Sequence, residues 1–132
     1  MSEVNFILPL DLCRTNLKAI QQLLDEVCPQ EAMKLMEHLN QLASMIGLSA
    51  QTQSSYRYHL EKQMNVNIPI AHKMKLPASL IKDYAHSCIP EIVSEYELAE
   101  RLNRGITHKL DAIRSILNYT KAENYNSKFQ QG

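Results

Sequence analysis

The sequence predicts an all-α fold, an antiparallel helical bundle with two long helices, an N-terminal helix and one short helix. The chain of 132 residues holds only three glycines and five prolines, and the prolines separate its segments. Between the prolines, apolar residues recur at spacings of three and four, which is the period of an amphipathic helix. The length suits one domain with a single core, so we expect these helices to pack together.

The N-terminal helix is predicted over residues 11–28. Its apolar face consists of residues at spacings of four and three, namely Cys13, Leu17, Ile20, Leu24 and Val27. Asp11 precedes this face and suits the N-cap, because its side chain accepts hydrogen bonds from the free N–H groups of a first turn. Pro29 follows the expected end of the helix.

The first long helix is predicted over residues 30–64. A three-four alternation typical of a coiled-coil seam runs through Ala32, Leu35, Leu39, Leu42, Ile46, Ser49, Gln53, Tyr56 and Leu60. Gly47, followed by Leu48 and Ser49, could instead end one helix and begin another. We favour one unbroken helix because the pattern keeps its phase across the glycine.

The segment "NVNIPIAHKMKLP", residues 65–77, is predicted to be a connection, because it has two prolines and no sustained period. Ile68, Ile70 and Leu76 are expected to contact the core. A short helix is predicted next, over residues 77–88. Pro77 suits its first position, where the missing N–H group is not needed.

The second long helix is predicted over residues 91–122, about 48 Å at 1.5 Å per residue. Its seam consists of Tyr96, Ala99, Asn103, Ile106, Leu110, Ile113, Leu117 and Thr120, widened by Leu102 and Ile116. The sequence after it is polar and aperiodic. We therefore expect one helical domain over residues 1–122 and a flexible polar tail over 123–132.

The overall composition favours a soluble cytoplasmic protein without a membrane segment. Fourteen basic residues balance fourteen acidic ones, and the excess of basic residues is confined to the middle third of the chain. The three cysteines have no CxxC spacing, which favours reduced thiols. No signal peptide and no run of 18 apolar residues is present in the sequence.

Sequence motifs for catalysis are missing. The chain contains no Walker loop, GxGxxG, HExxH or GxSxG motif, and its five histidines include no pair four residues apart that would hold a metal ion. We therefore expect a protein that is not an enzyme and needs neither a metal ion nor a cofactor.

A row of basic residues marks the face opposite the seam of the last helix. Arg101, Arg104 and His108 combine forked donors with an imidazole of variable charge, a set that suits a phosphate or carboxylate ligand. The alternative is a solvated face, because Glu97 and Glu100 each precede an arginine by four residues.

Two residues beside this row suggest that a ligand or another helix approaches the last helix closely. Gly105 removes a side chain next to Arg104, which would let a ligand or a neighbouring helix come near. Asn103 lies in the seam, where a polar residue often sets the register of helix pairing, within or between chains. We therefore predict an interface at Asn103 and Gly105.

A second candidate site lies in "SSYRYHLEKQ", residues 54–63. Tyr58 and Lys62 combine an aromatic ring with a cation, a pair that can stack on a base and hold its phosphate. Tyr56 belongs to the seam, so packing explains at least part of this motif.

The segment "ERLNRGITHKLDAIRSILNYTKAE", residues 100–123, resembles the C-terminal helix of small helical proteins encoded by phages and mobile elements. The resemblance implies a phage-type context, in which such proteins serve recombination and replication machinery or blunt host defence by binding a protein or sequestering a nucleotide signal. The two long helices also expose more seam than one short helix can cover, which favours self-association.

The expected function is therefore that of a self-associating binding protein in the cytoplasm of a bacterial host. It would capture a phosphate-bearing ligand such as a nucleotide. The alternative is an adaptor for phage DNA recombination or replication, acting through contacts with a protein or with single-stranded nucleic acid.

Overall fold

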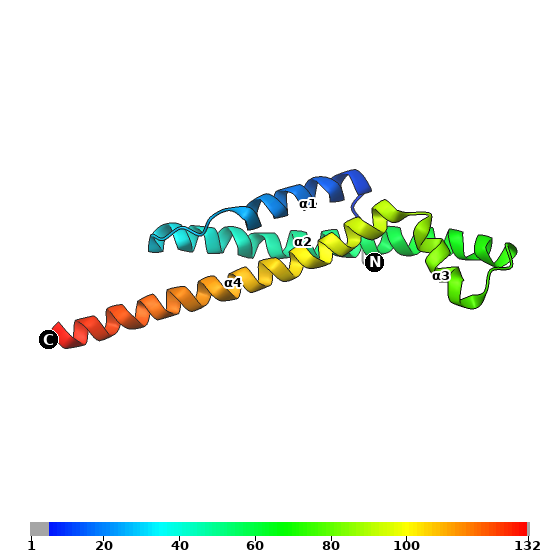
Figure 1. Ribbon diagram of the computed structural model, residues 1–132. Helices are drawn as coiled ribbons and strands as arrows, with labels where there is room; N and C mark the ends of the chain where they lie inside the picture. Colours follow the sequence, from blue (N-terminus) through cyan, green and yellow to red (C-terminus); the bar gives the residue numbers. More distant parts are fainter. Residues whose placement is uncertain (1–5, 132) are drawn as a thin grey trace, which may run out of the picture.

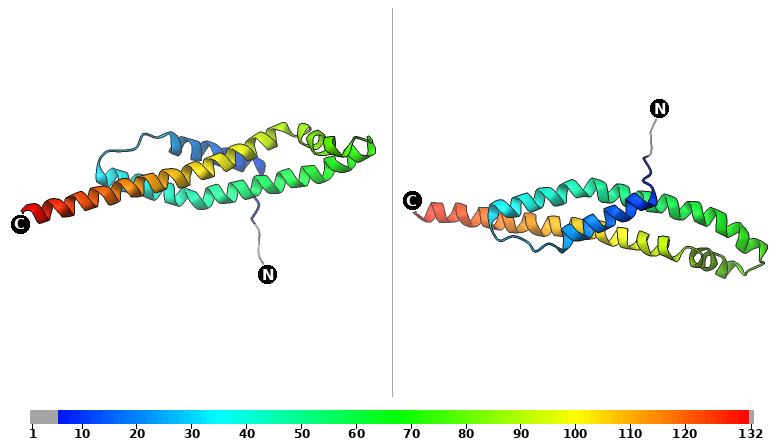
Figure 2. Two further views of the ribbon diagram at one scale, coloured as in Figure 1. Left: turned by 60° about the horizontal axis from the view of Figure 1, so that its bottom comes forward. Right: turned by 90° about the horizontal axis from the view of Figure 1, so that it is seen from above.

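Four helices form the structure, a computed structural model that describes the backbone of residues 6–131 and the side chains of residues 6–123. The helices are α1 (Leu10–Asp25), α2 (Ala32–Lys73), α3 (Ala78–Ser87) and α4 (Pro90–Gln131), and the described residues contain no strand. α2 and α4 lie along one another in opposite directions, α1 packs beside them, and α3 closes one end (Figures 1 and 2). The predicted all-α bundle is confirmed.

The core lies where α1, α2 and α4 meet. On α2, four buried residues follow one another at intervals of seven, namely Leu35, Leu42, Ser49 and Tyr56. On α4, Ala99, Ile106 and Ile113 are buried at the same interval. Each buried leucine or isoleucine contributes about 1.5–3 kcal/mol to the free energy of folding. The three-four pattern therefore identified the packed faces of both long helices.

The ends of α1 differ from the prediction. The N-cap is Pro9, and Asp11 lies in the first turn without making a side-chain cap. The helix ends at Asp25, and Val27 is almost fully exposed. The predicted end at residue 28 was wrong, since the backbone is already extended at Glu26; Pro29 in addition disfavours the helical conformation at Cys28.

α2 is one helix of 42 residues that passes through Gly47 and continues to Lys73. The prediction of a connection over residues 65–77 was therefore wrong for its first nine residues. Pro69 removes one helical hydrogen bond, but contacts with α3 hold the chain around it. Ala71 is fully buried, and the side-chain N–H of Asn67 donates to the carbonyl of Ala85 at 3.2 Å.

The real connection is short. The chain reverses at Lys75, whose φ of 59° is left-handed. α3 then begins after Pro77, which is the N-cap rather than the first helical residue. Of the three residues expected to contact the core from this region, Ile70 is 44% exposed.

α4 continues past the predicted end at residue 122, and its backbone is helical to Gln131. Its C-terminal end extends beyond the other helices (Figure 1). The flexibility expected of residues 123–132 remains a prediction, since their side chains, from 124 onwards, lie outside the described part. None of the helices in the described part has a stretch that is long and apolar enough to cross a membrane.

Candidate functional site

An open polar groove follows the line between α2 and α4, and it consists of two adjoining hollows. The larger, of about 350 Å³, is lined by Gln53, Glu100, Asn103, Arg104, Thr107 and His108. The smaller, of about 220 Å³, is lined by Ala50, Gln53, Ser54, Arg57, Tyr96 and Asn103. Gln53 and Asn103 belong to both hollows, so we call the pair together the α2/α4 groove.

The groove lies on the side of the α2–α4 pair that α1 leaves open. Successive residues of a helix are turned by about 100°, so Asn103 and Gly105 point in nearly opposite directions. Gly105 faces Leu24 of α1, and Asn103 therefore faces away from α1 into the groove. The position of α1 on one face thus determines which face of α4 is available to a ligand.

A hydrogen bond between two side-chain amides forms the floor of the groove. The Asn103 Nδ2 donates to Gln53 Oε1 at 2.7 Å, and both side chains are half-buried. This bond joins α4 to α2 within one chain. Asn103 therefore contributes to helix pairing inside the protomer, the first of the two possibilities that the sequence left open.

Arg104 and His108 both line the larger hollow, one helical turn apart, with Thr107 between them. No carboxylate in the described part of the chain forms an ion pair with Arg104 or with Arg101, so the pairs suggested by the Glu97 and Glu100 spacings are not made. The Arg104 guanidinium is therefore free to meet an anion. Arg101 is exposed and lines neither hollow.

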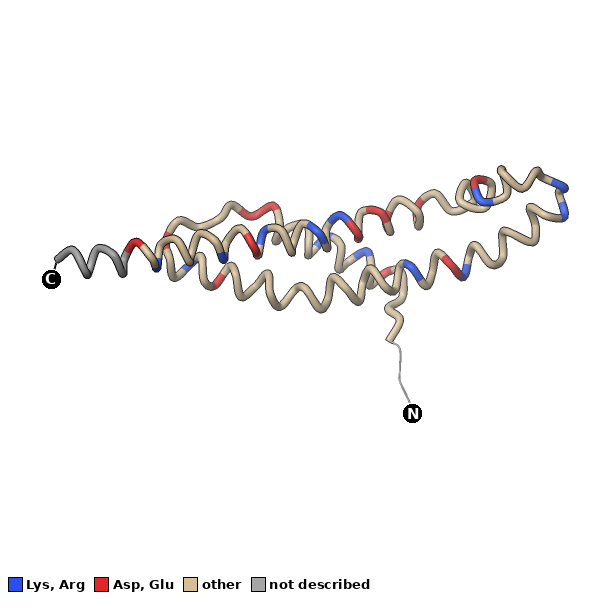
Figure 3. Tube along the Cα trace, turned by 90° about the horizontal axis from the view of Figure 1, so that it is seen from below, with Lys and Arg blue, Asp and Glu red and all other residues tan. Residues whose placement is uncertain are grey.

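Negative charge is also present in the groove. Glu100 lines the larger hollow beside Arg104, and acidic and basic residues follow in close succession along the middle of α4 (Figure 3). Partial burial and the neighbouring Glu100 carboxylate raise the pKa of Tyr96, which lines the smaller hollow. The site is therefore a mixed one, in which a neutral phenol and an acid accompany the two basic side chains.

Tyr58 and Lys62 lie apart from Arg104 and His108. Tyr58 lines a separate hollow of about 310 Å³, together with Phe6, Ile7, Ser54, Arg57 and Glu61. The Lys62 ammonium lies 6.0 Å from the centre of the Tyr58 ring, at the limit of a cation–π contact. Ser54 and Arg57 also line the smaller part of the α2/α4 groove, so the two sites adjoin without sharing the predicted residues.

Gly105 admits α1 rather than a ligand. A Cβ atom at this position would lie 3.2 Å from Cδ1 of Leu24, closer than ordinary van der Waals contact. One turn further along α4, the Lys109 ammonium donates to the carbonyls of Leu24 and Glu26 at 3.0 and 2.9 Å. These are free carbonyls at the end of α1, where positive charge is favourable.

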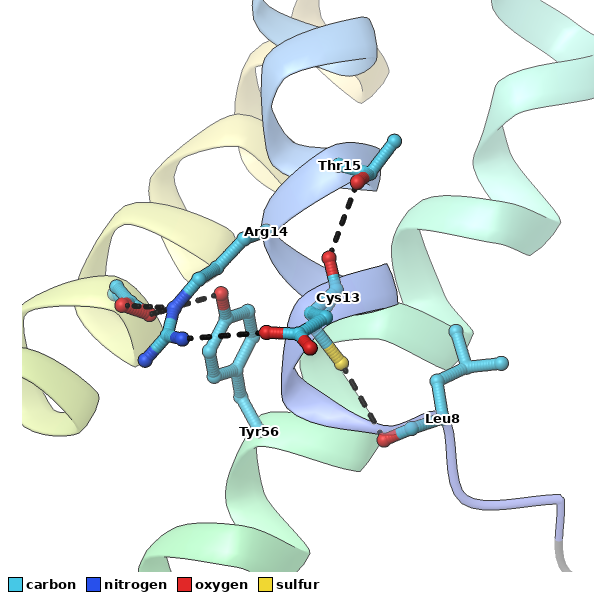
Figure 4. A network of polar contacts seen from close by, with 7 residues as sticks. Leu8, Cys13, Arg14, Thr15 and Tyr56 are labelled. Carbon is cyan, nitrogen blue, oxygen red and sulfur yellow. Dashed lines mark hydrogen bonds and ion pairs between the residues drawn. The ribbon is translucent and has the colours of Figure 1, made fainter.

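A polar network that the sequence did not reveal joins α1, α2 and α4 (Figure 4). The Arg14 Nε donates to Glu95 at 2.8 Å, and the Tyr56 hydroxyl donates to the same carboxylate at 3.1 Å. Burial, with the nearby Glu95 carboxylate, raises the pKa of Tyr56 and that of the Cys13 thiol. Because the bonds link residues 81 and 39 positions apart, no local pattern could have predicted them.

The chemistry of these sites lies in their separate polar and charged side chains. Within the described part of the chain, no group of three His, Cys, Asp or Glu side chains could hold a metal ion. The α2/α4 groove instead offers a free guanidinium, an imidazole, a hydroxyl and two amides. No known family model, curated protein or solved structure matches the chain.

Proposed function

We propose that this chain is a non-enzymatic, self-associating binding protein of a phage or mobile element that captures a phosphate-bearing ligand, such as a nucleotide, in the bacterial cytoplasm. The observation that carries the proposal is the pair Arg104 and His108 in one open hollow, with Arg104 free of any described acidic partner. A guanidinium binds a phosphate through two parallel hydrogen bonds, and an imidazole N–H adds a further donor.

The remaining lining of the hollow supports a small polar ligand. The Thr107 hydroxyl and the Asn103–Gln53 amides add uncharged donors and acceptors. Glu100 opposes an anion, so we expect moderate affinity. Sequestering a nucleotide signal of host defence would be one use of such a site.

Self-association has support in the exposed side of α4. Ile116 is 49% exposed and Tyr119 is 67% exposed, and both lie toward the end of α4 that extends beyond the bundle. Because they are three residues apart, both side chains lie on one side of α4, where together they could contact another chain. Light scattering tests this part of the proposal, with an expected mass above the 15.1 kDa of one chain.

Calorimetric titration with inorganic tripolyphosphate tests the ligand site. We expect Arg104→Ala to weaken binding about tenfold or more, since a charge-assisted hydrogen bond contributes about 1.5–3 kcal/mol. Arg114→Ala is the matched control, because Arg114 is an exposed arginine of the same helix that lines neither hollow. The phosphate site is excluded if the parent protein does not bind, or if the Arg104 and Arg114 variants bind equally well.

The adaptor remains the second candidate, supported by the hollow at Tyr58. Phe6, Ile7 and Tyr58 are all exposed there, and Lys62 adds a cation beside the ring. Binding of single-stranded DNA that weakens with salt and with Tyr58→Ala would support this function. Unaltered binding in Tyr58→Ala would remove it.

A further inference from the structure

The face of α2 that holds α1 continues beyond the beginning of α1. Thr52 accepts a hydrogen bond from Asn16 of α1 at 3.1 Å, and His59, seven residues later, contacts the Leu8 carbonyl at 2.8 Å. Another seven residues along the same line lies Val66. α1 runs beside only the first part of α2, so the face at Val66 has lost its cover (Figure 1).

This uncovered face is apolar over two further turns. Val66, Ile70 and Met74 follow at intervals of four residues, and they are 55%, 44% and 53% exposed. A spacing of four keeps side chains on one side of a helix. α3 meets α2 at Asn67, whose side-chain N–H donates to the Ala85 carbonyl at 3.2 Å, and it leaves about half of each stripe residue exposed.

The surroundings of the stripe are basic. At about 100° per residue, Lys62 and Lys73 lie within about 40° of Val66 around α2, and Lys75 follows in the turn. Between residues 60 and 76 the only acidic residue is Glu61, and it is paired with Arg57 at 3.1 Å. On α3, the positive charge of Lys82 is offset by the negative charge of Asp83. The exposed apolar stripe is therefore bordered by positive charge that no described acid offsets.

We propose that the stripe Val66–Ile70–Met74 docks an acidic amphipathic helix of a partner protein, which continues the line of α1 along α2. Two observations specify this occupant. The face is continuous with the one that already binds a helix, so its shape suits a helix with apolar residues three and four apart. The lysines beside it favour glutamate or aspartate on the flanks of that helix, which gives the contact its specificity.

Two synthetic helical peptides test the proposal. They share apolar residues at positions i, i+3, i+4 and i+7 and differ only in carrying glutamate or lysine at the flanking positions. Fluorescence anisotropy with the full chain measures their affinities. We expect the acidic peptide to bind and the basic one not to, and backbone NMR shifts from the acidic peptide to centre on residues 66–74.

Variants separate the apolar from the charged part of the contact. Ile70→Asp should weaken the binding of the acidic peptide at least about tenfold, because an apolar side chain that the peptide would bury is lost. Lys73→Glu should weaken the binding of the acidic peptide by a smaller factor and allow the basic peptide to bind. Leu80→Asp on α3 is the matched control: Leu80 is 49% exposed but lies outside the stripe, so affinity should not change.

Four outcomes overturn the proposal. The absence of binding by the acidic peptide, or equal binding of both peptides, removes the acidic helix as the occupant. A dimer that Ile70→Asp converts to monomer assigns the stripe to a second copy of the chain. Binding to anionic vesicles that Ile70→Asp abolishes, without binding to the peptide, assigns it to a lipid surface.

Discussion

Gly105 of α4 lies directly against Leu24 of α1, and a Cβ atom at position 105 would approach Cδ1 of Leu24 to 3.2 Å. A glycine in the middle of a helix costs about 0.5–1 kcal/mol relative to alanine. The close packing of α1 against α4 explains why position 105 holds a glycine. Arg104 and His108, on either side of Gly105 in the sequence, line the open α2/α4 groove.

The first prediction compares the two glycines of the long helices. Gly47→Ala should stabilise the chain by about 0.5–1 kcal/mol, because a Cβ there meets no described side chain within 4 Å. Gly105→Ala should raise the free energy of unfolding by clearly less, since the Leu24 side chain must move to admit the new methyl group. In a Leu24→Ala background the gain at position 105 should become equal to that at 47. Urea unfolding measures each free energy, and equal gains at both glycines in the parent chain would contradict this packing.

The second prediction concerns Lys109, which supplies the positive charge that the last turn of α1 lacks. Lys109→Met should keep the aliphatic stem and lose two hydrogen bonds to the Leu24 and Glu26 carbonyls, at a cost of about 1–2 kcal/mol. Amide hydrogen exchange should increase mainly at the end of α1. Lys121→Met, at an exposed site of the same helix, is the control and should change little.

The third prediction is the pH dependence of stability. The pKa of Tyr56 is raised above its ordinary 10.0 by burial and by the Glu95 carboxylate, so the folded state holds a proton that the unfolded chain releases first. Stability from this group is therefore complete below about pH 10 and falls as the pH rises above it. The pKa of the Cys13 thiol is raised from its ordinary 9.0 for the same reasons, so its ionisation also lowers stability as the pH rises.

Tyr56→Phe tests that dependence. It should cost about 1 kcal/mol at neutral pH, through the lost hydrogen bond to Glu95, and reduce the decline of unfolding free energy between pH 9 and 11. Tyr119→Phe, at an exposed position, should leave both quantities unchanged. A decline of equal steepness in the parent and in Tyr56→Phe would exclude this assignment.

The fourth prediction concerns Asn103. A polar residue in a helical seam would, on the sequence alone, be expected to reduce stability, so that a leucine would raise it. Because Asn103 is bonded to Gln53 at 2.7 Å, Asn103→Leu should instead lower the free energy of unfolding by about 1 kcal/mol. The double variant with Gln53→Leu should recover much of this loss, since no unpaired amide remains. Chemical denaturation with light scattering measures stability and assembly together.

The buried faces of α2 and α4 could be predicted because the spacing of apolar residues along one helix is a local property of the sequence. Leu42, Tyr56 and Ile106 are fully buried at positions that their spacing alone identifies as core. The helix ends were less predictable. Pro69 contributed to the prediction of a connection over residues 65–77, yet α2 passes through it, because contacts with the distant α3, such as the Asn67–Ala85 hydrogen bond, outweigh the lost hydrogen bond.

The candidate site was predicted in part. Arg104 and His108 share a hollow, as their spacing suggested, but Arg101, Tyr58 and Lys62 lie outside it. Gln53, Thr107 and Tyr96 were not identified as lining residues. Their contribution depends on the register of α2 against α4, which pairs residues about 50 positions apart, as in Asn103 and Gln53.

The sequence by itself determined that the chain is helical, and it determined the buried face of each long helix, because burial requires apolar residues at the helical period. The tertiary structure decided which helix meets which face. That choice depends on shape and charge between distant residues, such as Leu24 against Gly105 and Arg14 against Glu95. By placing α1 on one side of the α2–α4 pair, the same contacts left the opposite side open as a polar groove.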